Sequence, residues 1–162
     1  MKILIIGSKG FIGSHALSYF TTLGYDTYSA DVIVDYTLKN YYIIDSINCD
    51  FKNIFESNIF DVCINCSGAA SVPDSINNTL RDYTLNCINV FKLIENIKSY
   101  SPNCKFINLS SAAVYGNPNS IPINETDSLK PVSPYGFHKK FSEEILYEFY
   151  TLFVLLLPVI RW

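Results

Sequence analysis

One segment near the N-terminus decides the fold: Ile3-Leu4-Ile5-Ile6-Gly7-Ser8-Lys9-Gly10-Phe11-Ile12-Gly13. An apolar run, residues 3–6, is followed by three glycines with G-x-x-G-x-x-G spacing. Residues 11–23 then have helical periodicity. The first glycine permits a tight turn, the second lets backbone N–H groups approach a pyrophosphate, and the third lets the helix pack closely on the sheet. The helix N-terminus adds unpaired N–H donors and a partial positive charge. We therefore predict a dinucleotide site at Gly7, Gly10, Phe11, Ile12 and Gly13, with a purely structural turn as the alternative.

Beyond this turn, short apolar runs alternate with longer segments of helical period. The expected strands are residues 3–6, 25–30, 62–65, 104–109 and a final run at 152–160, and the expected helices are 11–23, 75–98 and 135–150. Such alternation favours βαβ units joined by right-handed crossovers. We therefore expect a single α/β domain over residues 1–162, a Rossmann-like, doubly wound parallel sheet with helices on both faces. Residues 116–134, rich in Pro, Asn and Ser, are expected to form an ordered surface loop.

The composition describes a globular protein and argues against two classes of partner. Hydrophobic residues make up 49% and charged residues 17% of the 162 residues, and the formal net charge is −3. Nucleic acids and anionic membrane surfaces both select a basic face, so neither is an expected partner. The longest apolar run, residues 152–160, contains Pro158 and is well short of the roughly 20 residues that span a bilayer.

The five cysteines are expected to be free thiols in the cytoplasm, because the N-terminus lacks the pattern of an export signal. Cys63 and Cys66 have the spacing of a redox or metal pair. However, they lie in an apolar strand pattern with no second pair and no nearby histidine. We expect ordinary packing for both thiols and no metal site.

A carboxylate follows the second predicted strand, at Asp31. In that position it can accept both hydroxyls of an adenine ribose and repel a 2′-phosphate, which favours NAD over NADP. The alternative is an aspartate that caps a turn or helix. Asp50 is a second candidate, for the adenine amino group, and its neighbour Phe51 is assigned to the same cofactor site.

Tyr135 and Lys139 have Y-x-x-x-K spacing, which places both side chains on one face of the predicted helix. A lysine ammonium beside a phenol favours the phenolate, so the pair can act as acid and base, and Lys139 can also bind the nicotinamide ribose. Chance supplies this spacing often in a chain with 12 tyrosines. It gains weight from Ser111, which follows a central strand and is expected to bind the hydroxyl that Tyr135 deprotonates. His138 is expected to face away from Tyr135, at the surface.

Five segments in order resemble the NAD-dependent epimerase/dehydratase family, of the extended short-chain dehydrogenase/reductase type: residues 7–13, Asp31, residues 65–72, residues 110–116 and residues 133–139. The likeness covers roughly residues 2–150. It implies an NAD cofactor whose adenine ribose and pyrophosphate lie above Asn65, Ser67, Gly68 and Ala69. It also implies that Asn86 supports the architecture of the active site.

Within the family, the resemblance is to UDP-sugar 4-epimerases. Sugar dehydratases carry an Asp-Glu pair directly after the serine, where this chain has Ala112 and Ala113, and alanine cannot eliminate water. The resemblance implies that Tyr135 removes the C4 hydroxyl proton and that NAD⁺ takes the C4 hydride. The 4-keto sugar then rotates and receives the hydride on its opposite face. Members that oxidise, reduce or decarboxylate the sugar share most of these residues and remain alternatives.

The chain departs from the family in length, because members are about twice as long and their second half holds the nucleotide sugar. The resemblance therefore implies that the C-terminal substrate domain is absent and that residues 151–162 are an atypical, truncated tail, with Arg161 at the place of a family arginine. A frameshift or premature stop, a fragment, and a missing half supplied by another polypeptide are three explanations.

Two further expectations follow from the resemblance. Without a second domain the sugar nucleotide is poorly positioned, so a non-catalytic NAD-binding module is the alternative to an enzyme. Family members often dimerise through a four-helix bundle, which implies a homodimer through the helices at residues 75–98 and 135–150.

Overall fold

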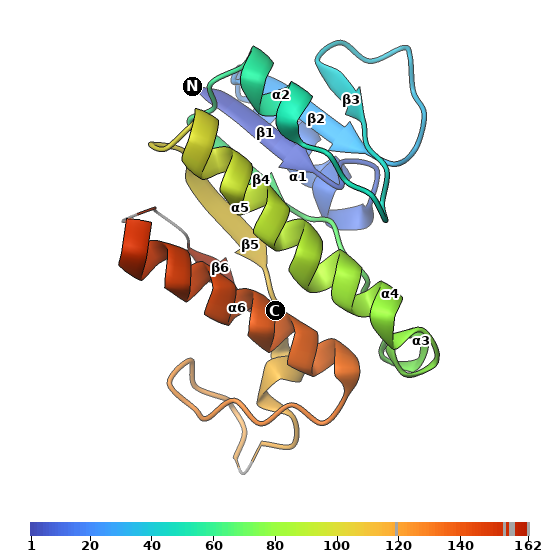
Figure 1. The fold of residues 1–162 in the computed structure, drawn as a ribbon, viewed down its shortest axis with the longest axis vertical. Helices are drawn as coiled ribbons and strands as arrows, with labels where there is room; N and C mark the ends of the chain where they lie inside the picture. Colours follow the sequence, from blue (N-terminus) through green and yellow to red (C-terminus); the bar gives the residue numbers. More distant parts are fainter. Residues whose placement is uncertain (119, 154, 156–157, 162) are drawn as a thin grey trace.

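The computed structural model describes residues 1–118, 120–153, 155 and 158–161. Six parallel strands form one sheet in the order β3-β2-β1-β4-β5-β6 (Figure 1). The strands are β1 (Lys2–Ile6), β2 (Asp26–Asp31), β3 (Tyr41–Ile43), β4 (Val62–Asn65), β5 (Lys105–Leu109) and β6 (Val159–Ile160). The direction in which strands are added reverses between β1 and β4, and ligands of doubly wound folds bind at the carboxyl edge beside such a switch point.

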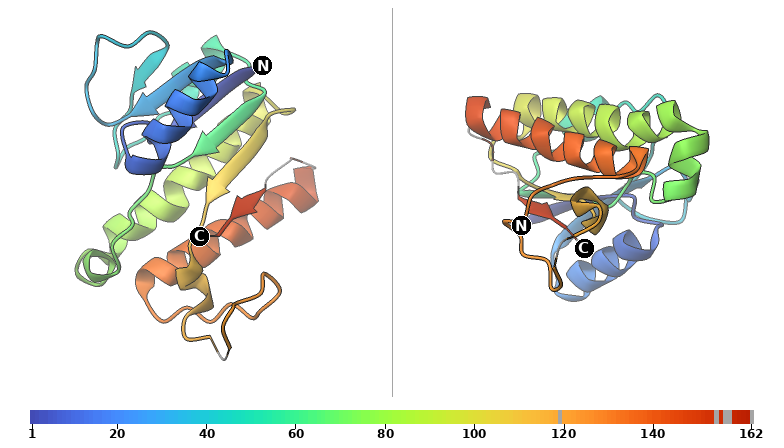
Figure 2. Two further views of the ribbon diagram at one scale, coloured as in Figure 1. Left: turned by 180° about the vertical axis from the view of Figure 1, so that it is seen from behind. Right: turned by 90° about the horizontal axis from the view of Figure 1, so that it is seen from below.

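Helices cover both faces of this sheet, as Figure 2 shows from below. One face carries α1 (Phe11–Thr22), and the other carries α2 (Lys52–Ser57), α5 (Asn89–Tyr100) and α6 (Pro134–Phe153). Alternation along β1 explains the two layers, because Ile3 and Ile5 pack toward α1 whereas Leu4 and Ile6 join the larger core on the opposite face. The predicted Rossmann-like, doubly wound α/β fold is confirmed.

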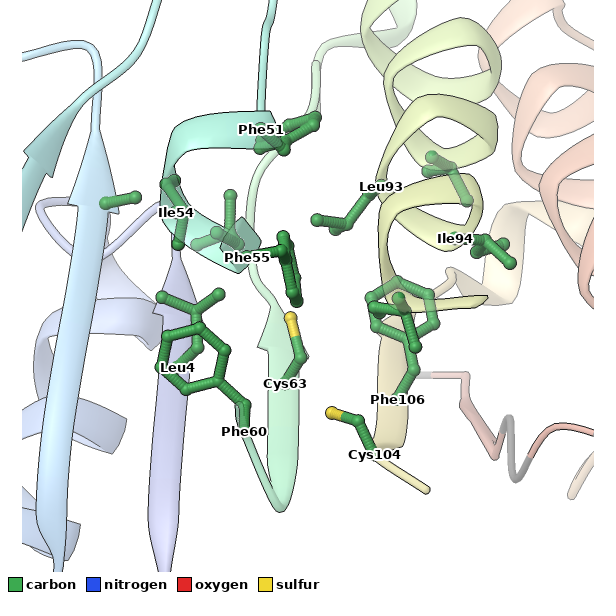
Figure 3. Close-up of a cluster of buried hydrophobic side chains, with 14 of the residues drawn as sticks. Leu4, Phe51, Ile54, Phe55, Phe60, Cys63, Leu93, Ile94, Cys104 and Phe106 are labelled. Atoms are coloured by element: carbon green, nitrogen blue, oxygen red, sulfur yellow. The ribbon is translucent and has the colours of Figure 1, made fainter. Parts of the chain in front are cut away.

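The larger core lies between the sheet and α2, α5 and α6. Figure 3 shows Phe55 on α2, Phe51 and Phe60 on either side of α2, and Phe106 on β5, in one layer with Leu93 and Ile94 of α5. Cys63 projects into this core, where burial raises the pKa of its thiol well above the ordinary value. Cys66 instead packs beside Ile3 and Ile5 on the α1 face. The two thiols therefore lie on opposite faces of β4 and do not form a common site.

The predicted helix at residues 75–98 is wrong as a single element. The structure divides this region into α3 (Val72–Asn77), α4 (Thr79–Tyr83), a π-helical segment η1 (Thr84–Ile88) and α5. The break between α3 and α4 falls at Asn78, whose φ of −129° and ψ of 53° are not helical. The Asn78 side-chain amide donates to Asp74, a local hydrogen bond of the kind that competes with helix formation.

Three other elements differ from the sequence-based expectation. β3 and α2 were not predicted, since each is short, with three and six residues. The final apolar run begins as the last turn of α6, and its strand is reduced to β6, which pairs with β5 at the edge of the sheet beside Pro158. Residues 154 and 156–157 of that run lie outside the described residues. In the described part of the chain, no helix combines the length and apolar character that crossing a membrane requires.

Candidate cofactor and catalytic site

The glycine turn lies at the carboxyl end of β1 and has little space for side chains. Gly7 has a φ of +79°, and a Cβ atom there would lie 2.7 Å from the backbone nitrogen of Ser67. A Cβ atom on Gly13 would lie 2.1 Å from the carbonyl oxygen of Gly7. Gly10 caps α1, followed by Phe11, which is exposed, and Ile12, which is half-buried. The turn thus brings the N-terminus of α1 next to the ends of β1 and β4, the geometry in which backbone N–H groups bind phosphate.

Asp31 ends β2 and its carboxylate is buried against three backbone N–H groups. One oxygen accepts from Lys9 at 2.8 Å, and the other accepts from Val32 at 2.7 Å and from Ile33 at 3.3 Å. Asp31 therefore does stabilise a turn, as the alternative interpretation holds. A carboxylate offers about four lone-pair sites, so it keeps acceptor capacity toward the cavity that it lines. Three of these sites are occupied and about one remains, so Asp31 can stabilise the turn and still accept from one ribose hydroxyl.

A cavity of about 370 Å³ extends from the turn along the ends of β2 and β4 to the helices that follow β4. Of the residues predicted from sequence, it is lined by Gly7, Gly10, Asp31, Ser67 and Gly68. The remainder of its wall, missed by sequence reasoning, consists of Lys9, Val32, Ile33, Ile44, Ser46, Cys49, Cys66, Arg81, Leu85 and Asn89. Much of this wall comes from the segment after β3 and from helices that the sequence pattern merged into one. A dinucleotide site needs backbone N–H donors for the pyrophosphate and apolar walls beside them, and this cavity has both.

Asp50 and Phe51 lie outside the lining of this cavity. The Asp50 carboxylate is exposed and accepts from the backbone of Lys52 at 2.9 Å, at the start of α2. Phe51 is 2% exposed and belongs to the larger core. Their neighbour Cys49 reaches the cavity instead. The assignment of Asp50 and Phe51 to the cofactor therefore stays a prediction, with their contacts accounting for local structure.

The end of β4 connects the cofactor cavity to the predicted catalytic residues. Asn65 fixes the strand end, since its side-chain oxygen accepts from the Ser67 hydroxyl at 2.6 Å and its amide donates to Asn108 at 2.8 Å. Gly68 follows with a φ of +127°, and Ala69 is half-buried beyond it. A Cβ atom on Gly68 would lie 2.6 Å from Asn86 Oδ1 and 3.6 Å from Lys139 Nζ. Gly68 thus lies where residues 65–69, the segment predicted to hold the cofactor, meet Asn86 and Lys139.

Tyr135 and Lys139 lie in the first two turns of α6, both buried. The Lys139 ammonium donates to the carbonyl oxygen of Leu109 at 2.9 Å and lies 5.9 Å from the centre of the Tyr135 ring. Burial lowers the pKa of Lys139 to about 8, and the nearby carboxylate of Asp82 opposes that change. The structure therefore brings the tyrosine and the lysine together at the carboxyl end of β5.

Ser111 lies just past β5 and directly before the 3-10 segment η2 (Ala112–Tyr115), which packs against the start of α6. A Cβ atom on Gly136 would lie 2.7 Å from the carbonyl oxygen of Ala113, so the backbones of η2 and α6 are in close contact. The Ser111 hydroxyl accepts from the backbone of Ala113 at 3.2 Å. Ser111 thus caps η2, the element that packs against the start of α6.

The prediction that His138 lies at the surface is wrong. His138 is 6% exposed, and its Nδ1 lies 2.5 Å from Asp82 Oδ1, in a contact between α6 and α4. The same aspartate oxygen accepts from the side-chain amide of Asn86 at 3.1 Å. The other oxygen of Asp82 and the side-chain oxygen of Asn86 are buried without a hydrogen-bond partner within the described residues. A buried polar cluster therefore lies directly behind Lys139.

Arg161 directly follows β6, at the edge of the sheet. Its Nε donates to both carboxylate oxygens of Glu143 on α6, at 3.0 Å to Oε1 and 3.1 Å to Oε2. Its Nη2 donates to Oε2 at 2.6 Å, and its Nη1 donates to the Tyr115 hydroxyl at 2.9 Å. The Glu143 carboxylate accepts from Ser110 as well, at 2.5 Å. These bonds raise the pKa of Arg161 above its ordinary value, with Glu143 as the main cause. The hydrogen bonds of Glu143 on α6 to Ser110 and Arg161 connect α6 to the ends of β5 and β6.

Fold and site together define a dinucleotide-binding Rossmann domain, with a phosphate-binding turn at the switch point and a tyrosine–lysine helix beside it. The profile of the family described as GDP-mannose 4,6 dehydratase matches residues 4–158. The chain therefore belongs to this family, that of the NAD-dependent epimerases and dehydratases.

Relatives named UDP-glucose 4-epimerase are similar to this chain in sequence and in structure. The enzyme of Lactobacillus helveticus is 30% identical over 90% of this chain and 46% of its own length. The UDP-glucose 4-epimerase of Thermotoga maritima, solved with UDP-glucose, is 30% identical with a TM-score of 0.89, over 99% of this chain and 55% of that one. The UDP-Glc/GlcNAc 4-epimerase of Campylobacter jejuni is 30% identical with a TM-score of 0.87, over 99% and 52%. The chain thus spans about half the length of these relatives.

Proposed function

We propose that this chain is the NAD-binding half of a nucleotide-sugar 4-epimerase, with a UDP-sugar as substrate. The observation that carries the proposal is a continuous series of close approaches. It runs from Asp31 through the glycine turn to Ser67, and from Gly68 to Asn86 and Lys139. Asp31 would hold the adenosine of a dinucleotide bound along this series, and Tyr135 and Lys139 would lie at its nicotinamide end. The names of the similar proteins support the same substrate class.

The chain's own residues supply acid–base chemistry at this end of the cavity. With its pKa lowered to about 8, Lys139 is mainly protonated at neutral pH, and its ammonium favours the phenolate of Tyr135. Tyr135 then takes the proton of the sugar C4 hydroxyl and later returns it, while Ser111 orients that hydroxyl. When bound, NAD supplies the hydride acceptor and donor. Ala112 and Ala113 carry no acid or base, so elimination of water is disfavoured.

Two measurements on the intact chain test this proposal. Titration with NAD⁺ by calorimetry measures cofactor binding, and conversion of UDP-galactose to UDP-glucose measures epimerisation. Tyr135→Phe should retain NAD⁺ binding and abolish any turnover. Tyr147→Phe is the matched control on the same helix, because Tyr147 is 70% exposed and far from the chemistry. Turnover that survives Tyr135→Phe, or a chain that binds no NAD⁺, contradicts the proposal.

A second candidate is a non-catalytic NAD-binding module, in which the cavity lined by Gly7, Gly10 and Asp31 holds the cofactor and no sugar nucleotide is converted. NAD⁺ binding without conversion of either sugar nucleotide supports the module. Oxidation, reduction or decarboxylation of the sugar are the family chemistries that product analysis separates from epimerisation.

We also propose a homodimer through α5 and α6, which lie side by side on one face (Figure 1). Exposed apolar side chains on these helices include Phe91 and Phe141, and Ile88 lies directly before α5, each close to two-fifths exposed. Light scattering should give twice the chain mass of 18.4 kDa. Phe91→Glu should yield monomers, whereas Tyr19→Glu, on the opposite face, should not. A wild-type monomer at micromolar concentration contradicts this dimer.

We also propose a cytoplasmic setting. The free state of all five cysteines is consistent with it.

A further inference from the structure

Both basic side chains that line the cofactor cavity are paired with an aspartate. Lys9 Nζ lies 2.5 Å from Asp35 Oδ2, and Arg81 Nη1 lies 2.8 Å from Asp74 Oδ2. Within the described residues, no other lysine or arginine lines this cavity. The cavity therefore contains cations whose charge is already compensated by partners of the chain itself.

Lys9 occupies a special position among these residues, because it touches the carboxylate that is expected to select the cofactor. Its backbone N–H donates to Asp31 Oδ2 at 2.8 Å, and its ammonium lies 5.5 Å from the centre of the Tyr41 ring, on β3. A 2′-phosphate on a ribose held at Asp31 would lie within the reach of this flexible side chain. Lysine is a common phosphate ligand, so an unpaired Lys9 would partly offset the repulsion by Asp31.

Asp35 is held in place independently of Lys9. Its second oxygen, Oδ1, accepts from the backbone N–H of Thr37 at 2.9 Å and from the Thr37 hydroxyl at 2.6 Å. Hydrogen bonds from Lys9 and Thr37 hold the pKa of the Asp35 carboxyl well below its usual range, so it stays ionised. The turn after β2 therefore presents a fixed negative charge that engages the Lys9 ammonium.

We propose that the Lys9–Asp35 pair is a second determinant of cofactor specificity, in which Asp35 withholds the Lys9 cation from a 2′-phosphate and so reinforces selection of NAD over NADP. The proposal rests on the proposed dinucleotide function and extends it to Lys9, within the glycine turn, and to Asp35, beyond β2. Asp31 rejects the phosphate by direct repulsion. Asp35 engages the Lys9 cation, which would otherwise partly compensate for that repulsion.

The test is a double-mutant cycle on the intact chain, read as the ratio of the dissociation constants for NADP⁺ and NAD⁺ by calorimetry. Asp35→Asn keeps the shape of the side chain and removes its charge, so Lys9 is released. The ratio should fall about tenfold, the effect of one partly exposed hydrogen bond to a charged group. In the variant that also carries Lys9→Gln, the gain should disappear. Asp74→Asn is the matched control, since it releases Arg81, which does not contact Asp31, and should leave the ratio unchanged.

The outcomes distinguish failure of the Lys9–Asp35 proposal from failure of the proposed NAD-binding function. A ratio that Asp35→Asn leaves within twofold of wild type, or a gain that persists with Lys9→Gln, overturns the role of the pair while the NAD site stands. A gain of equal size in Asp74→Asn also overturns it, because the effect is then one of net charge alone. A wild-type chain that binds neither dinucleotide refutes the cofactor function and this inference with it. Unfolding in urea, measured for every variant, verifies that each is folded.

Discussion

Replacing Lys139 by methionine should stabilise the fold while removing the residue that the proposed chemistry needs. Methionine has a similar length and no charge, and it fills irregular gaps in a core. Lys139 is 7% exposed, and burial lowers the pKa of its ammonium from the ordinary 10.5 to about 8. A cation that binds its proton less tightly in the folded state than in the unfolded state makes folding less favourable at neutral pH.

The size of the effect follows from that difference in pKa. A tenfold change in proton affinity is worth about 1.4 kcal/mol, so lowering the pKa from 10.5 to about 8 corresponds to roughly 3 kcal/mol of destabilisation below pH 8. Loss of the hydrogen bond from Lys139 to the Leu109 carbonyl offsets about 1 kcal/mol of the gain. We expect Lys139→Met to raise the free energy of unfolding by about 2 kcal/mol at neutral pH.

The sign of the pH dependence separates this explanation from a simple gain in packing. Between pH 8 and pH 10.5 the unfolded chain still holds the lysine proton and the folded chain has lost it, so the wild type becomes more stable as pH rises. The advantage of the variant should therefore be largest below pH 8 and vanish near pH 10.5. Urea unfolding followed by circular dichroism at both pH values measures it.

Lys140→Met is the matched control, because Lys140 is half-buried and pairs with Glu144 at 3.5 Å. Its stability should lie within about 0.5 kcal/mol of the wild type at each pH. The reasoning is refuted if Lys139→Met is less stable than the wild type at neutral pH, or if its advantage is the same at pH 10.5 as below pH 8.

Two further predictions concern the cluster around Gly68 and Asp82. Gly68→Ala places a Cβ atom 2.6 Å from Asn86 Oδ1 at a φ of +127°, so unfolding in urea should show a loss of about 1–3 kcal/mol and calorimetry a weaker affinity for NAD⁺. Gly24→Ala is its control, with a φ of +80° and open space around it, and an equal loss in both variants would mean that backbone conformation alone is responsible. Asp82→Ala should cost about 3–5 kcal/mol, because it leaves His138 and Asn86 buried without their partner. In the double variant with His138→Ala the loss should fall short of the sum by about 1 kcal/mol or more, and strict additivity would show that the two side chains are not coupled.

The fold was predictable because its determinants are local in sequence. A glycine triplet at the end of an apolar run fixes the turn through backbone conformation and close approach, and both were found at Gly7 and Gly13. Strand and helix periods fixed the parallel α/β class. The same periodicity failed where a local hydrogen bond interrupts it, as at Asn78, and where an element is as short as β3.

The site was predictable in its residue types and only in part in its arrangement. Spacing alone placed Tyr135 and Lys139 on one helix face, because four residues make about one turn. The sequence by itself thus determined the turn, the alternation of strands and helices, and the tyrosine–lysine pair. Each of these depends on interactions among residues close together in the chain.

Tertiary structure decided how these parts meet. Gly68 lies against Asn86 and Lys139, and His138 is buried because Asp82, 56 residues away in sequence, is packed against it. The wall of the cofactor cavity likewise includes Arg81 and Asn89, from helices that no local motif marks. Such contacts depend on the crossing of helices over the sheet, which no local period encodes, and they set the burial that lowers the pKa of Lys139. The sequence specifies which groups are present, and the packing of distant segments determines their charge state and their partners.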